Sequence, residues 1–308
     1  MVIHRGYEGF HPVKPVVTVG VFDGVHRGHN ALLETVVSKA KETGGESVVI
    51  TFSSHPRKVL GKESVELSYI TTPSEKTNLL ERMNIDHLVI LDFNIEFSRT
   101  GACDFVRNVI VKKIGAKYLI FGYDHRIGRE GEGDYNTIRQ CSGISDLIVE
   151  QGKGVFSGEV AISSSAIREA LLDGNLDVAN ELLGYPYQLG GTVVPGRKIG
   201  RSFGFPTANI KPDNQKLVPA KGVYAVEVLL EKKVYKGMLS IGTNPTVNPH
   251  SSVRSIEVHI IGFDENIYGR KISVRFRKRL RDEKKFPDID TLTRQMHADK
   301  QETIRVLS

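Results

Sequence analysis

Two histidines stand three residues apart in a stretch rich in glycine. His26 and His29 lie within the sequence GVFDGVHRGH at residues 20–29. Imidazole N–H groups can donate hydrogen bonds to a phosphate, and glycine lets the main chain approach a ligand closely. If a helix begins here, the two rings share one face of its first turn. The stretch therefore predicts an anion site suited to a nucleotide phosphate.

The elements around this stretch fit such a site. An apolar run at residues 16–19 precedes it, and apolar residues at helical spacing follow from residue 31 to residue 40. In a strand, glycine-rich turn and helix, main-chain N–H groups and the positive end of the helix face an anion. Further strands are predicted at residues 47–52, 87–91 and 117–121, with helices beginning at residues 73 and 102. This alternation predicts an α/β fold with a doubly wound parallel sheet.

Three more polar residues follow predicted strands. His55 follows one strand, and Asp124 and His125 follow another, so that with His26 they can converge on one crevice at the carboxyl ends of the strands. Each also has a structural explanation: His55 can be an incidental turn residue, and Asp124 a turn cap. The serines at residues 163–165 can simply cap a helix. Arg168, one turn further on, suits a phosphate at the start of that helix.

From about residue 185 the pattern changes to short strands with glycine and proline turns. Residues 191–194, 222–228, 234–241, 255–261 and 271–276 alternate with period two, which predicts a small antiparallel β-barrel. A mostly polar helix from residue 288 to about residue 307 is expected to pack on its outside. We therefore predict two domains, residues 1–184 and 185–308.

The second half offers one loop and one carboxylate for chemistry. Glycines and basic residues at 196–204 can hold a polyphosphate, and Thr207 and Asn209 can supply oxygen ligands to a magnesium–nucleotide complex. Glu257 lies between Ile256 and Val258 on a predicted strand, so its side chain faces either a site or water. The residues alone leave both explanations open.

Composition restricts the class of protein. The 308 residues carry a net charge of +6, and the only dense basic run, at residues 275–281, is followed by acidic residues, which is typical of a solvated face. Nucleic acid is therefore not the expected partner. No apolar run reaches the roughly 20 residues that span a bilayer, and no signal peptide is predicted. Cys103 and Cys141 are too few for a metal cluster or a disulfide framework. A cytoplasmic protein is expected.

The motifs resemble those of a known family. GVFDGVHRGH is similar to the His-x-Gly-His signature of nucleotidyltransferases, and in its longer form to the adenylyltransferase half of bacterial bifunctional riboflavin kinase/FAD synthetases. Residues 51–56 and 162–168 match further elements of that half. Residues 200–209 resemble the riboflavin kinase signature Gly-Arg-x-x-Gly-Phe-Pro-Thr-Ala-Asn, and residues 222–224, 242–246 and 257–259 match later elements in order. After the fourth strand the family usually reads Gly-Glu-Asp/Asn-Phe-x-Phe-Gly, whereas this chain has GYDHRIG at residues 122–128.

The resemblance implies two ATP-dependent reactions. The barrel would phosphorylate riboflavin to FMN, and the first domain would adenylylate FMN to FAD and release pyrophosphate. ATP, the flavins and Mg²⁺ would be the small molecules involved, with no nucleic acid or membrane partner, and the chain would be a monomer or weak homo-oligomer. Two other classes remain: a single-activity adenylyltransferase whose barrel only binds, and a non-enzymatic flavin-binding or nucleic-acid-binding module.

The resemblance also assigns residues. For adenylyl transfer it implies His26 and His29 as catalytic residues, an ATP site that they share with Gly20, Phe22, Asp23, Gly24, Gly28, Ser164 and Arg168, and a flavin site with His55, Pro56 and Asp124. For the kinase it implies Glu257 as catalytic base, a phosphate site with Gly196, Lys198, Gly200, Arg201, Gly204, Pro206, Thr207 and Asn209, magnesium at Thr207 and Asn209, and flavin contacts from Glu257 and Arg281.

Overall fold

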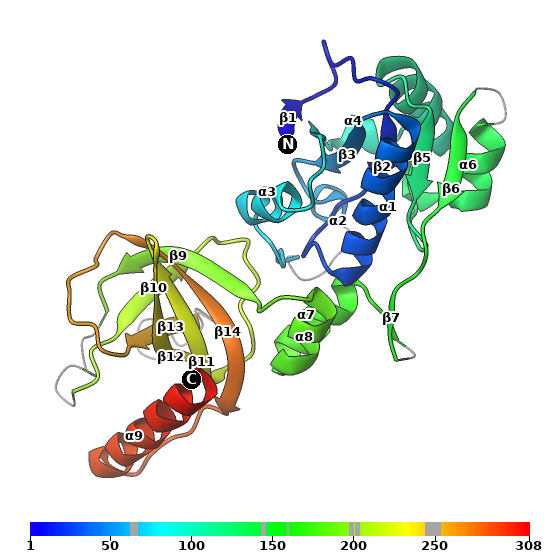
Figure 1. Cartoon of the computed structure of the whole chain (residues 1–308). Coiled ribbons are helices and arrows are strands. Elements are labelled where there is room, and N and C mark those ends of the chain that lie inside the picture. The colour runs from blue at the N-terminus through cyan, green and yellow to red at the C-terminus, as the bar shows by residue number, and fades with distance from the viewer. Residues whose placement is uncertain (62–66, 143–145, 159, 197–199, 201–203, 244–253) are drawn as a thin grey trace. The chain divides into compact units, whose positions relative to one another are not determined.

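The chain forms two compact units. The structure, a computed structural model, describes residues 1–61, 67–142, 146–158, 160–196, 200, 204–243 and 254–308. Within it the chain divides into Met1–Ser163 and Ser164–Ser308 (Figure 1). The predicted boundary between residues 184 and 185 stays a prediction about the working domains. The helices before it, α7 (Ser164–Asp173) and α8 (Leu176–Leu183), belong to the second compact unit.

A parallel sheet forms the centre of the first unit. Its strands lie in the order β1-β4-β3-β2-β5-β6, and every neighbouring pair is parallel. The elements are β1 (Val2–Arg5), β2 (Val16–Val19), α1 (Arg27–Thr43), β3 (Ser47–Phe52), α2 (Pro56–Val59), α3 (Pro73–Glu81), β4 (His87–Leu91), α4 (Ile95–Ser98), α5 (Ala102–Phe105), the π-helix η1 (Val106–Lys113), β5 (Tyr118–Phe121), the 3-10 helix η2 (Arg129–Gly131), α6 (Tyr135–Ser142), β6 (Ile148–Gln151), and the hairpin strands β7 (Phe156–Ser157) and β8 (Val160–Ala161).

Helices cover both faces of this sheet. Val16 and Val49 pack with α1 and α3, whereas Val17 and Val48 pack with α5, η1 and α6. Strands buried on both faces have no polar side, which explains their continuous apolar sequences. The predicted doubly wound sheet is therefore confirmed.

The order of the strands defines where a ligand should bind. From β2 the chain proceeds to β3 and β4 on one side, and later to β5 and β6 on the other. The order therefore reverses between β2 and β5, and ligands of open α/β sheets bind at such a switch point, beyond the carboxyl ends of the strands. Residues 20–29 follow β2 and residues 122–125 follow β5, so both lie at this point.

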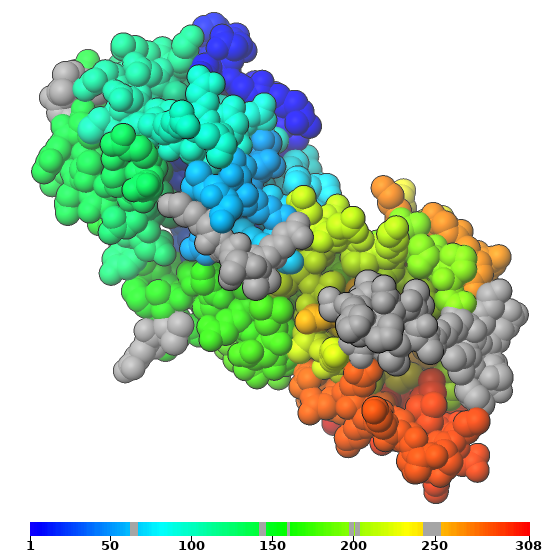
Figure 2. Space-filling model, turned by 180° about the vertical axis from the view of Figure 1, so that it is seen from behind, coloured from blue at the N-terminus to red at the C-terminus, as the bar shows by residue number. Residues whose placement is uncertain are grey.

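The described residues of the second unit form a barrel with three helices. Its strands close in the order β10-β13-β12-β11-β14-β9, which confirms the predicted barrel. The elements are α7 (Ser164–Asp173), α8 (Leu176–Leu183), β9 (Gln188–Val194), β10 (Ala208–Pro212), β11 (Gly222–Leu230), β12 (Lys233–Thr243), β13 (Arg254–Ile260), β14 (Lys271–Arg281) and α9 (Ile289–Val306). Helix α9 packs on β11, β12 and β14, as predicted, and Figure 2 shows residues of this red and orange C-terminal region on the surface. The basic run lies on β14, where Glu227 pairs with Arg275 and Arg277.

One ion pair fastens α9 to the barrel. The guanidinium of Arg281 donates from Nε and Nη2 to Oδ2 of Asp299, at 2.9 and 2.8 Å. The two side chains are only 15% and 6% exposed. Removing one partner of a buried pair leaves the other charge without compensation. The contact thus gives Arg281 a structural role, whereas its predicted role toward the flavin stays a prediction.

We expect Asp299→Ala to lower the free energy of unfolding by about 3–5 kcal/mol, because it leaves the poorly hydrated Arg281 charge without a counter-charge. Urea unfolding followed by circular dichroism measures the change. Glu302→Ala is the matched control, since Glu302 lies on the same helix and pairs with the exposed Arg305, where an ion pair contributes at most about 1 kcal/mol. Equal effects of the two substitutions would contradict the prediction.

The two cysteines form a disulfide. Cys103 on α5 and Cys141 on α6 are joined, with 5.3 Å between their Cα atoms. Two cysteines 38 residues apart do not by themselves indicate a bond, because the bond depends on how the fold places two helices. In the part of the chain that the structure describes, no helix is long and apolar enough to cross a membrane.

Candidate active sites

The two histidines form a reciprocal cap at the start of α1. The main-chain N–H of His29 donates to Nδ1 of His26, and the N–H of His26 donates to Nδ1 of His29, each at 3.3 Å. The rings stack with their centroids 3.6 Å apart. Because each Nδ1 accepts a hydrogen bond, the proton of each neutral ring must be on Nε2. The cap therefore fixes both tautomers at the positive end of a 17-residue helix.

His29 is held neutral. Burial lowers its pKa well below the ordinary 6.5, and charges on His26, His125 and Lys76 lower it further. The rings of Phe22 and His29 pack edge to face, with 5.1 Å between their centroids. Phe22 itself is fully buried at a positive φ of 52°, a conformation that costs free energy and is found at functional sites. His29 is thus a neutral imidazole with a donor at Nε2, and its role toward a phosphate stays a prediction.

Asp23 and Gly24 connect this loop to a neighbouring segment. The buried carboxylate of Asp23 accepts hydrogen bonds from the N–H groups of Ile70 and Thr71, at 3.1 and 3.0 Å. The N–H of Gly24 donates to the hydroxyl of Thr71 at 2.9 Å. These contacts give both residues a part in shaping the loop, and their contact with ATP stays a prediction.

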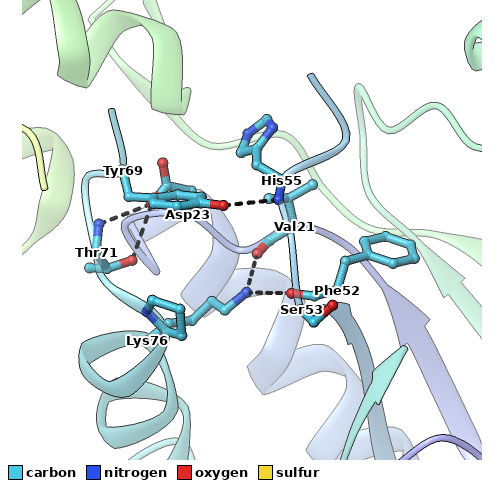
Figure 3. A pocket seen from close by; sticks show the side chains of 9 residues that line it. Val21, Asp23, Phe52, Ser53, His55, Tyr69, Thr71 and Lys76 are labelled. Carbon is cyan, nitrogen blue, oxygen red and sulfur yellow. Dashed lines mark hydrogen bonds between the residues drawn. The ribbon is translucent and has the colours of Figure 1, made fainter. Parts of the chain in front are cut away.

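A pocket lies beside the loop, on the β3 side of β2 (Figure 3). It is narrow, with about 10 Å³ of space wide enough for a water molecule, and it is partly open to solvent. Its polar members include His55, whose N–H donates to the Tyr69 hydroxyl at 3.0 Å, and Lys76. The lining residues are Val21, Asp23, Phe52, Ser53, His55, Tyr69, Thr71, Pro73 and Lys76.

Lys76 is a buried charged residue of this pocket that the sequence motifs do not indicate. Its ammonium donates to the carbonyl of Val21 at 3.1 Å and to the hydroxyl of Thr51 at 3.0 Å. Burial lowers its pKa to about 8, although the negative charge of Asp23 acts in the opposite direction. A lysine on an amphipathic helix usually faces water, and only the packing of α3 against β3 reveals that this one does not.

The buried Lys76 predicts a pH effect on stability. Between pH 8 and 10.5 the unfolded chain keeps this proton and the folded chain loses it, so the unfolding free energy should rise with pH. In that window the unfolding free energy of wild type should rise relative to that of Lys76→Met, by at most about 1.4 kcal/mol per pH unit. Urea unfolding of both proteins at pH 7.5 and 9.5 measures this difference. Lys112→Met, at an exposed site, is the control; pH-independent differences for both variants would refute the prediction.

The other predicted residues of this half are only partly brought together. Pro56 begins α2, and His55 caps it by accepting the N–H of Arg57. His55 follows β3 whereas Asp124 follows β5, on the opposite side of β2, and Asp124 is exposed. Ser164 and Arg168 lie on α7 in the second unit. Their predicted roles, and those of Gly20 and Gly28, stay predictions.

In the barrel, the predicted kinase residues meet. The hydroxyl of Thr207 donates to Oε2 of Glu257 at 3.1 Å. Asn209 on β10 stands directly opposite Glu257 on β13 in the strand pairing. All three are half-buried. Glu257 therefore faces Thr207 and Asn209, and its role as a catalytic residue stays a prediction.

Described residues of the segment before β10 lie close to this cluster. A Cβ on Gly196 would lie 2.0 Å from the amide nitrogen of Asn209, so a larger residue there would displace the Asn209 side chain. Gly200 accepts the N–H of Phe205 at 2.9 Å, Gly204 has a positive φ of 77°, and the Pro206 carbonyl lies 2.9 Å from Nδ1 of His259. Lys198 and Arg201 lie outside the described residues.

The cluster fits a nucleotide-bound magnesium ion. A hydroxyl and an amide oxygen are the hard donors that Mg²⁺ takes together with phosphate oxygens. Among the residues that the structure describes, no group of three or more His, Cys, Asp or Glu side chains is placed to hold a metal. The donor chemistry therefore suits an ion that arrives with ATP.

Comparison with known proteins identifies both halves. Residues 11–166 match the FAD synthetase family model and residues 183–307 the riboflavin kinase model. The bifunctional riboflavin kinase/FMN adenylyltransferase of Bacillus subtilis is 36% identical over 303 residues, which cover 96% of this chain and 93% of the relative. The protein of the same name from Escherichia coli is 36% identical, with 92% and 90% covered.

These matches define a two-part transferase. The chain belongs to the bifunctional riboflavin kinase/FMN adenylyltransferase family, and its function is that of a riboflavin kinase and FAD synthetase. A crystal structure titled as a macrolide-efflux protein from Streptococcus pneumoniae shares the fold, with a TM-score of 0.87, 31% identity, and 98% and 99% of the two chains covered.

Proposed function

We propose that the two reactions take place at the two clusters described above, adenylyl transfer at His26 and His29 and phosphorylation of riboflavin at Thr207, Asn209 and Glu257. The reciprocal histidine cap is the observation that carries the first assignment, because it directs two Nε2–H donors away from the helix. The bond between Thr207 and Glu257 supports the second. The working domains are residues 1–184 and 185–308.

In adenylyl transfer, a phosphate oxygen of FMN attacks the α-phosphorus of ATP, and pyrophosphate leaves. The two Nε2–H groups donate to the oxygens on which negative charge increases, and they need no reorganisation because the cap holds the rings. The phosphate of FMN is already a nucleophile, so no covalent intermediate with the enzyme is needed. Ser164 and Arg168 bind the outer phosphates, and His55, Pro56 and Asp124 contact the flavin.

In the kinase reaction, Glu257 accepts the proton of the riboflavin 5′-hydroxyl as that oxygen attacks the γ-phosphorus. Thr207 donates to Glu257 and so orients the carboxylate. Mg²⁺, when bound with ATP, neutralises phosphate charge in this kind of reaction. Thr207 and Asn209 would hold it, and the glycines of residues 196–204, with Lys198 and Arg201, surround the polyphosphate. Arg281 contacts the flavin.

Further expectations concern the setting of the enzyme. We propose that it works in the cytoplasm, as a monomer or weak homo-oligomer, on small molecules and not on nucleic acid. The ion pairs that Glu227 makes with the basic strand β14 support the last point.

Separating the flavins after incubation with magnesium-ATP tests the proposal. With riboflavin we expect FMN first and FAD after it, and with FMN we expect FAD directly. FAD formation from FMN without phosphorylation of riboflavin would favour an adenylyltransferase with a binding barrel. No conversion by the folded protein would refute both assignments.

A further inference from the structure

The loop between β2 and α1 contains two strained residues. Phe22 and Val25 have φ angles of 52° and 36°, in the left-handed region that side chains rarely adopt and that suits a β-branched residue least. Such a conformation costs free energy and persists only where surrounding contacts fix it. The loop leads directly into the cap formed by His26 and His29. Contacts from outside the loop must therefore maintain the main chain that places the two imidazoles.

Contacts from a distant segment of the chain hold the loop on both sides of Phe22. The carboxylate of Asp23, which follows Phe22, accepts hydrogen bonds from the N–H groups of residues 70–71, at 3.1 and 3.0 Å. The ammonium of Lys76 donates to the carbonyl of Val21, which precedes Phe22, at 3.1 Å. These partners are 47 to 55 residues away along the chain. The strained residue is thus fixed by tertiary contacts before and after it.

The ammonium of Lys76 contacts three neutral acceptors. Besides the carbonyl of Val21 they are the hydroxyl of Thr51, at 3.0 Å, and the carbonyl of Phe52, at 3.4 Å. Figure 3 shows the two carbonyls with the ammonium between them. An ammonium carries three donors, and these contacts use all three. In this arrangement the group therefore holds the main chain and has no donor left for a phosphate.

Satisfying these acceptors would be a purely structural role for Lys76, but two of them have another partner. The hydroxyl of Thr51 donates to the carbonyl of Val21 at 3.2 Å, so these groups would still be paired if Lys76 were replaced by an apolar residue. Burying a charge costs free energy, as the lowered pKa of Lys76 indicates. A costly group beside a strained loop is typical of a functional site, where local rules of stability are broken.

Phe22 connects the carbonyl of Val21 to His29. That carbonyl belongs to the peptide that joins Val21 to Phe22, so a displacement of this peptide also displaces the Phe22 ring. The ring is fully buried and packs edge to face with His29. A Cβ on Gly20 would lie 2.9 Å from the same ring, so the main chain confines it on another side. A shift at Val21 is therefore transmitted to the imidazole.

We propose that Lys76 is a positioning residue of adenylyl transfer: by holding the carbonyl of Val21, it keeps Phe22 packed against His29. The Nε2–H donor of His29 then stays directed at the reacting phosphate. The inference rests on the proposed function, because it takes His26 and His29 as the α-phosphate site. In this role Lys76 contacts neither ATP nor FMN.

The test is a double-mutant cycle on the rate of FMN adenylylation, with Lys76→Met, His29→Ala and the variant that carries both. Lys76→Met alone should lower kcat by about 10–10²-fold, the effect of a small misplacement of a catalytic group, and leave the KM values for ATP and FMN unchanged. In the His29→Ala background it should have no further effect, because the residue through which it acts is gone. Lys112→Met, at an exposed site, is the control and should leave the rate unchanged.

The results separate this inference from a structural role and from the proposed function. Phosphorylation of riboflavin by the same variants should stay at the wild-type rate, and its loss together with adenylylation would indicate general damage and overturn the inference. Equal losses from Lys76→Met in both backgrounds would show that it does not act through His29. A raised KM for ATP or FMN with unchanged kcat would show that Lys76 binds substrate instead.

A second variant keeps the test decisive if Lys76→Met does not fold. Lys76→Gln keeps a polar donor at this place, and circular dichroism shows which variant is folded. The same cycle with Lys76→Gln should again show a loss of kcat only where His29 is present. If wild type forms no FAD from FMN and ATP, the proposed function fails and the inference with it. If wild type forms FAD and the two losses multiply, only the inference fails.

Discussion

Glu257→Gln is expected to lower the rate of riboflavin phosphorylation by about 10²–10⁴-fold, the contribution of a positioned general base. Glutamine keeps the shape of the side chain and an oxygen that can accept from Thr207, but it cannot take the hydroxyl proton. Chromatography of the flavins measures the FMN formed from riboflavin. The same protein should adenylylate added FMN at the wild-type rate, because His26 and His29 are unchanged.

Two further measurements make this result specific. Glu227→Gln on β11 removes a glutamate of the same barrel that pairs with surface arginines, and it should leave both rates unchanged. The pH profile of Glu257→Gln should lose the acidic limb that a general base produces. A kinase rate within threefold of wild type would exclude Glu257 as the base, and loss of both activities from a folded protein would contradict the two-site assignment.

His29→Ala is expected to lower FMN adenylylation by about 10²–10³-fold, the effect of removing one positioned donor to a developing negative charge. Phosphorylation of riboflavin should persist, so FMN should accumulate without FAD. The pKa of His29 lies well below 6.5, so His29 itself should cause no fall in the wild-type rate as the pH passes downward through 6.5. A fall near pH 6.5 that is present in wild type and absent from His29→Ala would show that His29 titrates as an ordinary histidine.

The substitution also removes a helix cap, and this effect needs its own control. Losing a cap costs about 1 kcal/mol of stability, which thermal unfolding detects. Thr35→Ala, at an exposed position of the same helix, controls for a general effect on α1. An adenylylation rate of His29→Ala close to that of wild type would show that the imidazole does not act on the α-phosphate.

Much of the fold could be predicted from local sequence, and the exceptions have physical causes. β4 occurs at the predicted residues because its apolar run is bounded by clear turns. The sequence predicts Ala208 and Asn209 as the end of a binding loop, yet they begin β10. Asn and Pro disfavour strands, and here the pairing with β9 and β13 overrides that preference. The short strands β1 and β6 lie at the edges of the sheet and have exposed residues, so their hydrophobic pattern is weak.

The candidate sites were predictable as motifs but not as contacts. The spacing of His26 and His29 indicates a shared face of a helix. The structure adds that the main-chain N–H of each histidine donates to Nδ1 of the other. Nothing in the sequence near Lys76 indicates that its ammonium reaches Val21 and Thr51, because those contacts join segments far apart in the chain. The local sequence does not indicate the pairing of Arg281 with Asp299 either, for the same reason.

The place of β10 in the barrel has a consequence for how the enzyme responds to its substrates. β10 joins β9 to β13, and among the residues that the structure describes two pairs connect it to β13: Ala208 with Val258, and Asn209 with Glu257. Without β10 the other five strands would form an open sheet. A ligand that binds Thr207 and Asn209 would therefore also hold the barrel shut, and its binding free energy would add to the stability of this joint. Amide hydrogen exchange in β10 should therefore slow when magnesium-ATP is present, because bound substrate makes local unfolding of β10 less frequent.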